Sequence, residues 1–333
     1  MTTIRDIAKH AQVSVTAVSY ALNNTGTLSA ETRQRILQVA EELNYHPNAF
    51  ARHLKKRQTY TLGVFISSFG GQFYEDILEG IHQTLLQTEY EMLVCPQARA
   101  LRKILTQRQV DGAIVFDSTV ESDLLLKLVA PDFPIVVMDR YFENDSLLPL
   151  LLDNRGGTQE AFYHLYDQGF RHIAFVAGVL HNFDNTERQE TFLAEAARNG
   201  LDVPVYQGDF VESSGYQIAT QLLHEGTLPE AVFCANDQMA IGFIKAVQEH
   251  ALCVPKDVAV VGFDDILTAR IMRPTLSTIG APRFEWGAQA AAQLVAYLEH
   301  AAPFAPQRLP THLIVRESSV RTPPPSPNHR RAP

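Results

Sequence analysis

The chain is 333 residues long, and its composition and charge exclude several classes of protein. Hydrophobic residues make up 46% of the chain and charged residues 20%, the balance of a folded globular protein of two or three domains. No apolar run approaches the ~18 residues that a membrane span requires, and the opening Met1–Asp6 segment is not that of a signal peptide. Three widely spaced cysteines indicate reduced thiols. We therefore expect a soluble, cytoplasmic protein.

The charge is unevenly distributed along the chain, whose net value is −9. Residues 1–60 contain eight Lys or Arg and four acidic residues, a balance of +4, so the remainder carries −13. A small basic head on a large acidic body indicates a polyanion-binding module joined to another unit. Chance clustering of surface charge would give the same balance, so the pattern of residues must decide.

Three short helical patterns occupy the basic head. They begin after Thr3, Ser14 and Ser29, each a favourable N-cap, and the third stops before Pro47. A tight turn joins the first two helices, and the second carries small polar residues on its outer face. This arrangement predicts a helix-turn-helix, although any helical hairpin can imitate one.

Three motifs of the head resemble the lactose/galactose-repressor (LacI/GalR) family of transcription regulators. They are TIRDIA at 3–8, VSVTAVSYALN at 13–23 and YHPNAFARHL at 45–54. The resemblance implies a DNA-binding headpiece over residues 1–46 and a hinge helix or linker over 47–59 that orders against DNA. It also implies a homodimer that binds a palindromic double-stranded operator.

The resemblance assigns DNA-binding roles to individual residues. Val15, Thr16 and Tyr20 match positions of the recognition helix that face base edges in the major groove. Leu54 matches an apolar wedge pushed into the minor groove, and the alternative for it is an ordinary core leucine. The remaining DNA-binding positions implied in this way are Thr3, Ser14, Ser19, Asn23, Asn48, Ala51, Arg52 and Lys55.

From residue 60 onward, apolar strand patterns alternate with helical patterns. The strands are expected near 61–66, 111–116, 135–138, 172–178, 231–234 and 258–263. The helices between them are expected near 73–88, 99–108, 121–128, 156–168, 185–199, 213–224 and 237–250. Continuously apolar strands between helices indicate parallel sheets covered on both faces. The predicted fold class is α/β, with an all-α headpiece followed by two doubly wound parallel-sheet lobes.

The resemblance extends to this body, which is similar to the family's periplasmic-binding-protein-like effector domain. We expect the effector-binding and dimerisation domain to span 60–320, with a helix near 284–300 and a late strand over 311–317. Its first lobe would comprise about 60–156 and 288–316, its second lobe about 157–287 and 317–321. Residues 322–333 are proline-rich and expected to be disordered.

Polar residues gather at the expected ends of strands, where parallel lobes bind ligands. By the resemblance, Arg188, Asn236 and Asp264 would hydrogen-bond an effector, and Phe73 and Phe210 would stack on an apolar ring face. Asp139 completes the expected effector-binding set. Alternatives remain for three of these positions. Asp264 also fits a turn residue or a helix cap, and Arg188 also fits a surface ion pair. Asn236 is ambiguous because its neighbour Asp237 also fits the N-cap of the following helix.

No enzyme motif is present in the sequence. It contains no glycine-rich phosphate loop, no nucleophile elbow and no histidine spacing typical of a metal site, so no enzyme, cofactor or metal is expected. The leading hypothesis is a repressor of carbohydrate-metabolism genes controlled by a sugar or sugar phosphate, with a purine as the second choice. The alternative is a cytosolic sugar-binding or sugar-processing protein whose basic head is a protein-interaction module.

Overall fold

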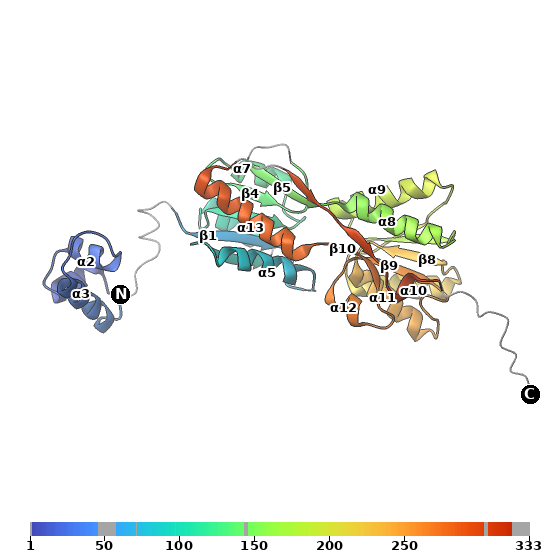
Figure 1. The fold of residues 1–333 in the computed structure, drawn as a ribbon, viewed down its shortest axis with the longest axis horizontal. Coiled ribbons are helices and arrows are strands. Elements are labelled where there is room, and N and C mark those ends of the chain that lie inside the picture. The colour runs from blue at the N-terminus through green and yellow to red at the C-terminus, as the bar shows by residue number, and fades with distance from the viewer. Residues whose placement is uncertain are drawn as a thin grey trace, which may run out of the picture. The chain divides into compact units, whose positions relative to one another are not determined.

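The computed structural model describes residues 2–45, 58–70, 72–96, 98–142, 146–302 and 306–321. The chain divides into two compact units, Met1–Thr59 and Tyr60–Pro333 (Figure 1). We call them the headpiece and the effector unit and describe each by itself. Five of the predicted DNA contacts and the expected disordered tail lie outside the described residues: Asn48, Ala51, Arg52, Leu54, Lys55 and 322–333.

Residues 2–45 of the headpiece form three helices that begin at the predicted caps. The backbone N–H and the hydroxyl of Thr3 both donate to the Asp6 carboxylate, at 2.8 and 2.7 Å. The hydroxyl oxygens of Ser14 and Ser29 each accept a backbone N–H three residues further on, at 3.1 and 3.2 Å. These bonds satisfy amides that a helix start would otherwise leave unpaired. The helices are α1 (Ile4–His10), α2 (Val15–Leu22) and α3 (Ala30–Glu42).

The headpiece has a very small hydrophobic core. Among its described residues, four of the seven buried apolar side chains are alanines, and the larger ones come one from each helix: Ile7, Val18 and Ile36. Domains of this size bury only a modest share of their surface and are marginally stable. Each large side chain in this core therefore carries a substantial part of the stability of the headpiece.

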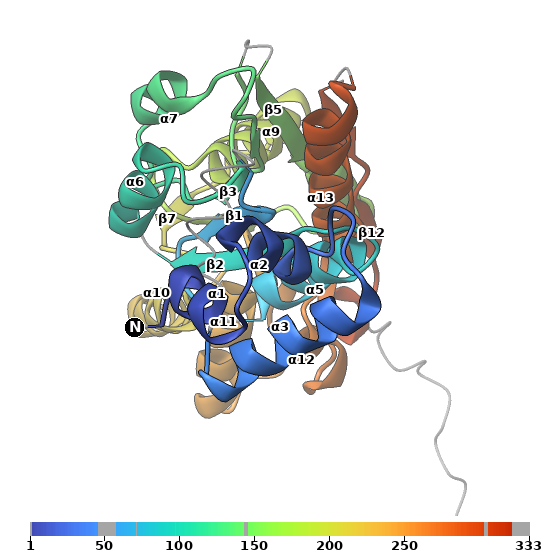
Figure 2. The ribbon, with the colours of Figure 1, turned by 90° about the vertical axis from the view of Figure 1, so that its left-hand side faces the viewer.

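The first lobe of the effector unit is built on a six-stranded sheet of order β11-β5-β4-β3-β1-β2, in which every pair is parallel. Side chains alternate along each strand, so Val64 faces one core and Phe65 the other. Helices α5 and α13 cover one face, and α6 and α7 the other (Figures 1 and 2). The strands are β1 (Thr61–Ile66), β2 (Glu91–Pro96), β3 (Gly112–Phe116), β4 (Ile135–Val137), β5 (Leu147–Leu152) and β11 (Gln307–Leu309). The helices are α5 (Phe73–Leu85), α6 (Ala98–Thr106), α7 (Ser122–Leu128) and α13 (Arg283–His300).

The second lobe repeats this plan with the order β12-β10-β9-β8-β6-β7. All its pairs are parallel except β10 with β12. Helices α8 and α9 lie on one face, and α10 and α11 on the other (Figure 1). The strands are β6 (Ile173–Ala177), β7 (Val205–Gln207), β8 (Ala231–Cys234), β9 (Ala259–Asp264), β10 (Ser277–Gly280) and β12 (His312–Ile314). The helices are α8 (Asn154–Asp167), α9 (Phe183–Arg198), α10 (Glu212–Glu225), α11 (Asp237–Glu249), α12 (Leu267–Ile271) and the 3₁₀ turn η1 (Glu317–Ser319).

The two parallel-sheet lobes and the helical headpiece confirm the predicted fold class, but two lobe boundaries differ from the expectation. Strand β12 belongs to the second sheet, so the chain enters that lobe before His312 and not near 316. Helix α13 packs along α5 of the first lobe from its first residue, Arg283, whereas residues up to 287 were expected in the second lobe. The expected strand over 311–317 is shorter, because η1 occupies its end. Among the described residues, no helix is both long enough and apolar enough to cross a membrane.

Candidate effector site and nucleic-acid interface

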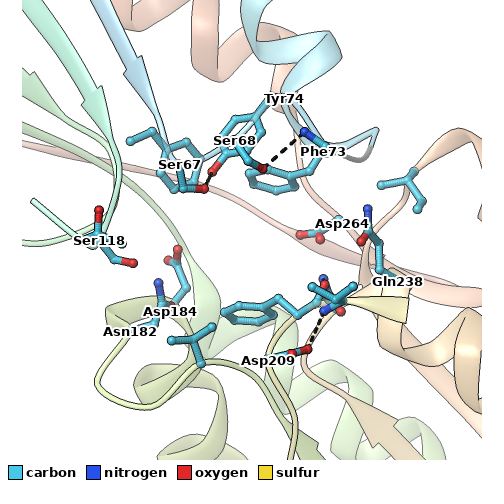
Figure 3. Close-up of a pocket in the computed structure, with 18 of the residues that line it drawn as sticks. Ser67, Ser68, Phe73, Tyr74, Ser118, Asn182, Asp184, Asp209, Gln238 and Asp264 are labelled. Atoms are coloured by element: carbon cyan, nitrogen blue, oxygen red, sulfur yellow. Dashed lines mark hydrogen bonds between the residues drawn. The ribbon is translucent and has the colours of Figure 1, made fainter. Parts of the chain in front are cut away.

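A cavity of about 310 Å³ lies between the two lobes of the effector unit. It is formed where the carboxyl ends of strands from both sheets meet, as expected for open parallel sheets. Figure 3 shows Ser67, Ser68, Phe73 and Tyr74 on one side, with Asn182, Asp184 and Asp209 opposite and Asp264 between them. Its walls also include Phe116, Ser118, Thr119, Val179, Arg188, Phe210, Val211, Asn236, Gln238 and Ile266.

Arg188 enters the cavity wall from the second turn of α9, and only 3% of it is exposed. Its Nε donates to the Oδ1 of Asn154 at 2.8 Å, and its Nη1 donates to the carbonyl of Ala235 at 2.7 Å. The guanidinium carbon lies 3.5 Å from the centre of the Phe263 ring. These contacts fix the orientation of the guanidinium, and the alternative of a surface ion pair is wrong.

Asp264 presents an unsatisfied carboxylate oxygen at the cavity. Its buried Oδ1 has no hydrogen-bond partner among the described residues, and its closest cationic atom is Nη1 of Arg188 at 4.0 Å. Burial raises the pKa of this carboxyl to about 7. Asp264 and Asp265 have φ angles of 113° and 55°, a backbone conformation that non-glycine residues rarely adopt. A buried acceptor held in this way is suited to a hydrogen-bond donor on a ligand.

Asp184 is a second buried carboxylate in the wall, and sequence reasoning missed it. It lies in the first turn of α9, where the Nδ2 of Asn154 donates to its Oδ1 at 2.8 Å. Asn154 therefore connects Asp184 to Arg188. Burial raises the pKa of Asp184 to about 6, an effect opposed by the charge of Arg188.

Asn236 and Phe210 form one structural unit. The Oδ1 of Asn236 accepts the Met239 N–H at 3.0 Å and so caps α11, which makes the alternative of an Asp237 cap wrong. Its Nδ2 donates to the carbonyl of Phe210 at 2.9 Å. The Phe210 ring lies over Gly178, where a Cβ atom would approach ring carbons to 2.2 Å, so a larger residue there would displace the ring. Asn236 lines the cavity and also positions this aromatic wall.

Of the six predicted effector-binding residues, Asp139 does not line the cavity. Its carboxylate accepts hydrogen bonds from Nε and Nη2 of Arg140, at 3.0 and 2.9 Å. A strand-end position alone could not reveal that its neighbour in sequence would bind it. Phe73 does line the cavity, where its ring meets those of Tyr74 and Phe116 edge-on at 5.3 and 5.4 Å.

Several other lining residues follow strands directly, which is the signal that could have identified them. Ser67 and Ser68 come immediately after β1, and Ser118 and Thr119 lie just beyond β3. Their hydroxyl groups add donors and acceptors to the wall. Over the residues that the structure describes, no group of three or more His, Cys, Asp or Glu is placed to hold a metal ion.

Helix α2 of the headpiece, the predicted recognition helix, presents a mixed apolar and polar surface. Val15 and Tyr20 are 39% and 41% exposed, and Thr16 is exposed beside them. The ring of Tyr20 lies over Gly26, where φ is 65° and a Cβ atom would come within 2.5 Å of that ring. Arg33 of α3 donates a hydrogen bond to the Oδ1 of Asn24, just after the end of α2, at 2.7 Å. The positions predicted to face base edges are therefore held on a defined helix.

The remaining described residues that were predicted to contact DNA lie on or beside helices α1 and α2. Thr3 and Ser14 are exposed at the starts of α1 and α2, and Ser19 is half-buried within α2. Asn23 ends α2, and its amide donates to the carbonyl of Ser19 at 2.8 Å. Exposed hydroxyls and amides at helix ends are groups that proteins use to contact DNA phosphates.

Comparison with known proteins agrees with this architecture. Residues 3–48 match the family described as bacterial regulatory proteins of the lacI family, and residues 162–319 match the periplasmic binding protein-like domain. An HTH-type transcriptional repressor PurR from Pasteurella multocida is 34% identical over 300 residues, covering 87% of this chain and 90% of the relative. The PurR repressor of Actinobacillus pleuropneumoniae is 32% identical over 331 residues, covering 96% and 98%.

Solved structures resemble the whole chain as well. The lac repressor dimer bound to operator and the anti-inducer ONPF has a TM-score of 0.80 and 27% identity, with 96% of this chain and 99% of that chain covered. The complex of the transcriptional regulator CelR with cellobiose has a TM-score of 0.71 and 27% identity, covering 96% and 100%.

A helix-turn-helix headpiece joined to a two-lobed effector unit defines a ligand-regulated DNA-binding protein. The chain belongs to the lacI family of bacterial regulatory proteins, as its match to the PurR repressors over nearly their whole length shows. It is a DNA-binding transcriptional regulator.

The raised pKa of Asp264 predicts a pH-dependent stability. Because its pKa is about 7 in the folded protein and near 3.8 when unfolded, the folded state binds a proton more tightly. The free energy of unfolding therefore falls as pH rises from about 4 to about 7. Asp264→Asn removes the group whose ionisation causes this loss of stability. The variant should therefore be more stable than the parent at pH 8 by a few kcal/mol, because each unit of pKa difference between the folded and unfolded states corresponds to about 1.4 kcal/mol.

Thermal unfolding of both proteins between pH 4 and pH 8 measures this difference. The exposed Asp202→Asn, in the same lobe, is the matched control and should show no pH-dependent difference from the parent. A difference between Asp264→Asn and the parent that stays constant across this range would contradict the prediction.

Proposed function

We propose that the protein is a non-enzymatic cytoplasmic repressor that binds palindromic operator DNA as a homodimer and responds to an uncharged saccharide bound between its lobes. The exposed face of α2 would read base edges, with Val15 contacting a thymine methyl and Tyr20 offering one hydroxyl. The effector would change the affinity for DNA only as far as it binds the two lobe arrangements unequally.

The observation that carries the choice of effector is the charge of the cavity wall. Among the described residues that line the cavity, the carboxylates of Asp184, Asp209 and Asp264 face a single guanidinium, that of Arg188. Arg188 already donates to two protein oxygens and lies beside Asp264. A phosphate group would add two negative charges, and this described part of the wall offers no further Lys or Arg to meet them, so its desolvation would be uncompensated.

Hydroxyl groups suit the same wall well. The unsatisfied Oδ1 of Asp264 needs a donor, and a sugar hydroxyl supplies one. Phe73 and Phe210 offer apolar ring faces for the C–H side of a sugar ring. The cellobiose-bound regulator CelR and a LacI-family regulator from Enterococcus faecium with bound ribose (25% identity, TM-score 0.73) support a neutral saccharide by analogy.

A thermal-shift screen tests the effector class. The full-length protein is heated with ribose, glucose, cellobiose, glucose 6-phosphate, ribose 5-phosphate or adenine. We expect a neutral sugar to raise the melting temperature, because a ligand that binds only the folded state stabilises it. The corresponding phosphate should give no shift. A larger shift with a sugar phosphate or with adenine would overturn the saccharide proposal.

A further inference from the structure

Arg283 connects the two lobes directly behind the ligand-facing carboxylate. It is the first residue of α13, in the first lobe, and its side chain is 4% exposed. Its Nη1 donates to the main-chain carbonyl of Asp264, and its Nη2 donates to the carbonyl of Asp265 at 3.3 Å. Both carbonyls lie at the end of β9 in the second lobe, in two residues with positive φ angles.

The same guanidinium is anchored within its own lobe by Asp76. The Oδ2 of Asp76, in the first turn of α5, lies 2.5 Å from Nη2 of Arg283. Helix α5 begins at Phe73, one turn before Asp76. Phe73 and Tyr74, in this same first turn, line the cavity. Asp76 is half-exposed, whereas Arg283 is buried, so the carboxylate holds a cation that has little access to water.

Helices α5 and α13 form a closely packed pair that would move together. A Cβ atom at Gly80 would lie 2.0 Å from the carbonyl oxygen of Phe284, and one at Gly287 would lie 2.0 Å from that of Ile77. Because the two backbones touch at both glycines, neither helix can tilt without the other. A displacement of the backbone at Asp264 would therefore move Arg283, and with it both helices.

A second contact joins the two lobes, between the N-cap of α5 and helix α12. The side-chain oxygen of Gln72, the N-cap of α5, accepts hydrogen bonds from the backbone N–H and the hydroxyl of Thr268, at 3.0 and 2.9 Å. Asp265 forms a further ion pair, with Arg270 at 2.8 Å, in which both residues lie in the second lobe.

The Arg270–Asp265 pair involves an arginine and the same segment but does not connect the lobes. Arg270 is therefore the control residue for Arg283.

We propose that Arg283 is a positioning residue that ties the turn at Asp264 and Asp265 to the first turn of α5 and so sets the angle between the lobes. The inference rests on the proposed role of the cavity as the effector site, because an effector held by Asp264 would then act on the lobe angle through this side chain. Asp76 holds the guanidinium in the orientation that reaches both carbonyls.

The distance between the lobes in solution tests this proposal without effector or DNA. Spin labels are attached at Asp132→Cys in the first lobe and Glu225→Cys in the second, both exposed, in a full-length chain carrying Cys95→Ser and Cys253→Ser. The labelled chain is diluted into excess unlabelled chain, so that distances within one protomer dominate. The distance distribution is then measured by pulsed electron resonance.

We expect Arg283→Gln to shift or broaden the distribution by several ångströms and Asp76→Ala to change it in the same direction. The double variant should not exceed Arg283→Gln, since both substitutions remove one linkage. Arg270→Gln should leave the distribution unchanged. Should Arg283→Gln fail to fold, Asp76→Ala decides the matter, because its side chain is half-exposed.

An unchanged distribution in folded Arg283→Gln and Asp76→Ala overturns the proposal, as does an equal change in Arg270→Gln. Since neither sugar nor DNA is present, this result is independent of the proposed function. A failed sugar screen would overturn the saccharide proposal and leave the lobe linkage in place.

Discussion

Ile36→Ala is expected to unfold the headpiece and abolish DNA binding while the effector unit remains folded. Ile36 is fully buried, and among the described residues it is the only large side chain of α3 that is buried in the headpiece core. Truncating a buried isoleucine to alanine costs about 2–5 kcal/mol. Native domains have a total stability of only about 0.05–0.15 kcal/mol per residue, so this loss is comparable to the whole stability of the headpiece.

The neighbouring residue provides the control. Leu37 follows Ile36 on α3 and is 45% exposed, so Leu37→Ala removes a similar volume from the surface and should leave DNA binding within a few-fold of the parent. Two-dimensional NMR of the headpiece signals and a gel shift with operator DNA measure folding and binding. Retention of both dispersed headpiece signals and operator affinity in Ile36→Ala would show that this core is not what holds the DNA-binding surface together.

Arg188→Ala is expected to lower the affinity for the effector about 100-fold and to leave DNA binding without effector intact. The substitution removes the contacts that order this wall, and it leaves the Oδ1 of Asp264 without the guanidinium that favours its charged form. The hydrogen bond from the sugar to this carboxylate then loses its charge assistance. Charge-assisted hydrogen bonds are worth about 1.5–3 kcal/mol each, and about 2.8 kcal/mol corresponds to 100-fold in affinity. Calorimetric titration of the sugar found in the screen measures the change.

A control on the same helix separates this effect from a loss of helix stability. Arg198, near the end of α9, pairs with Glu195 at 2.7 Å, and its side chain is 68% exposed. Arg198→Ala removes an arginine and an ion pair at the surface and should not alter effector affinity. Equal affinities of Arg188→Ala and the parent would place the effector elsewhere.

The fold was predictable because its long elements follow elementary patterns. The caps at Ser14 and Ser29 and the continuous apolar strands of both sheets were sufficient to predict the headpiece and the two lobes. Two short strands were not predictable in the same way. Strands β7 and β11 have three residues each and mostly exposed side chains, so no apolar pattern marks them. Their pairing depends on neighbouring strands, which is information that a local pattern does not contain.

The cavity was partly predictable because parallel strands end at a common edge. Asp264 was chosen from its strand-end position and from the resemblance, and Arg188 from the resemblance and its place early in a helix; both line the cavity. The same rule misplaced Asp139, whose carboxylate is bound by the adjacent Arg140. It also gave no reason to choose Asp184, whose position depends on where α9 starts. Which side chain at a strand end faces the ligand is decided by tertiary contacts that sequence spacing does not encode.

The most direct test of the account is a selection of DNA by the full-length protein from a random pool of duplexes, followed by sequencing with and without the sugar that raises the melting temperature. We predict enrichment of one inverted-repeat sequence, together with a change in its retention when that sugar is present. A pool that shows no preference for any twofold-symmetric sequence, in either condition, would contradict the central claim that this chain is an effector-controlled DNA-binding regulator.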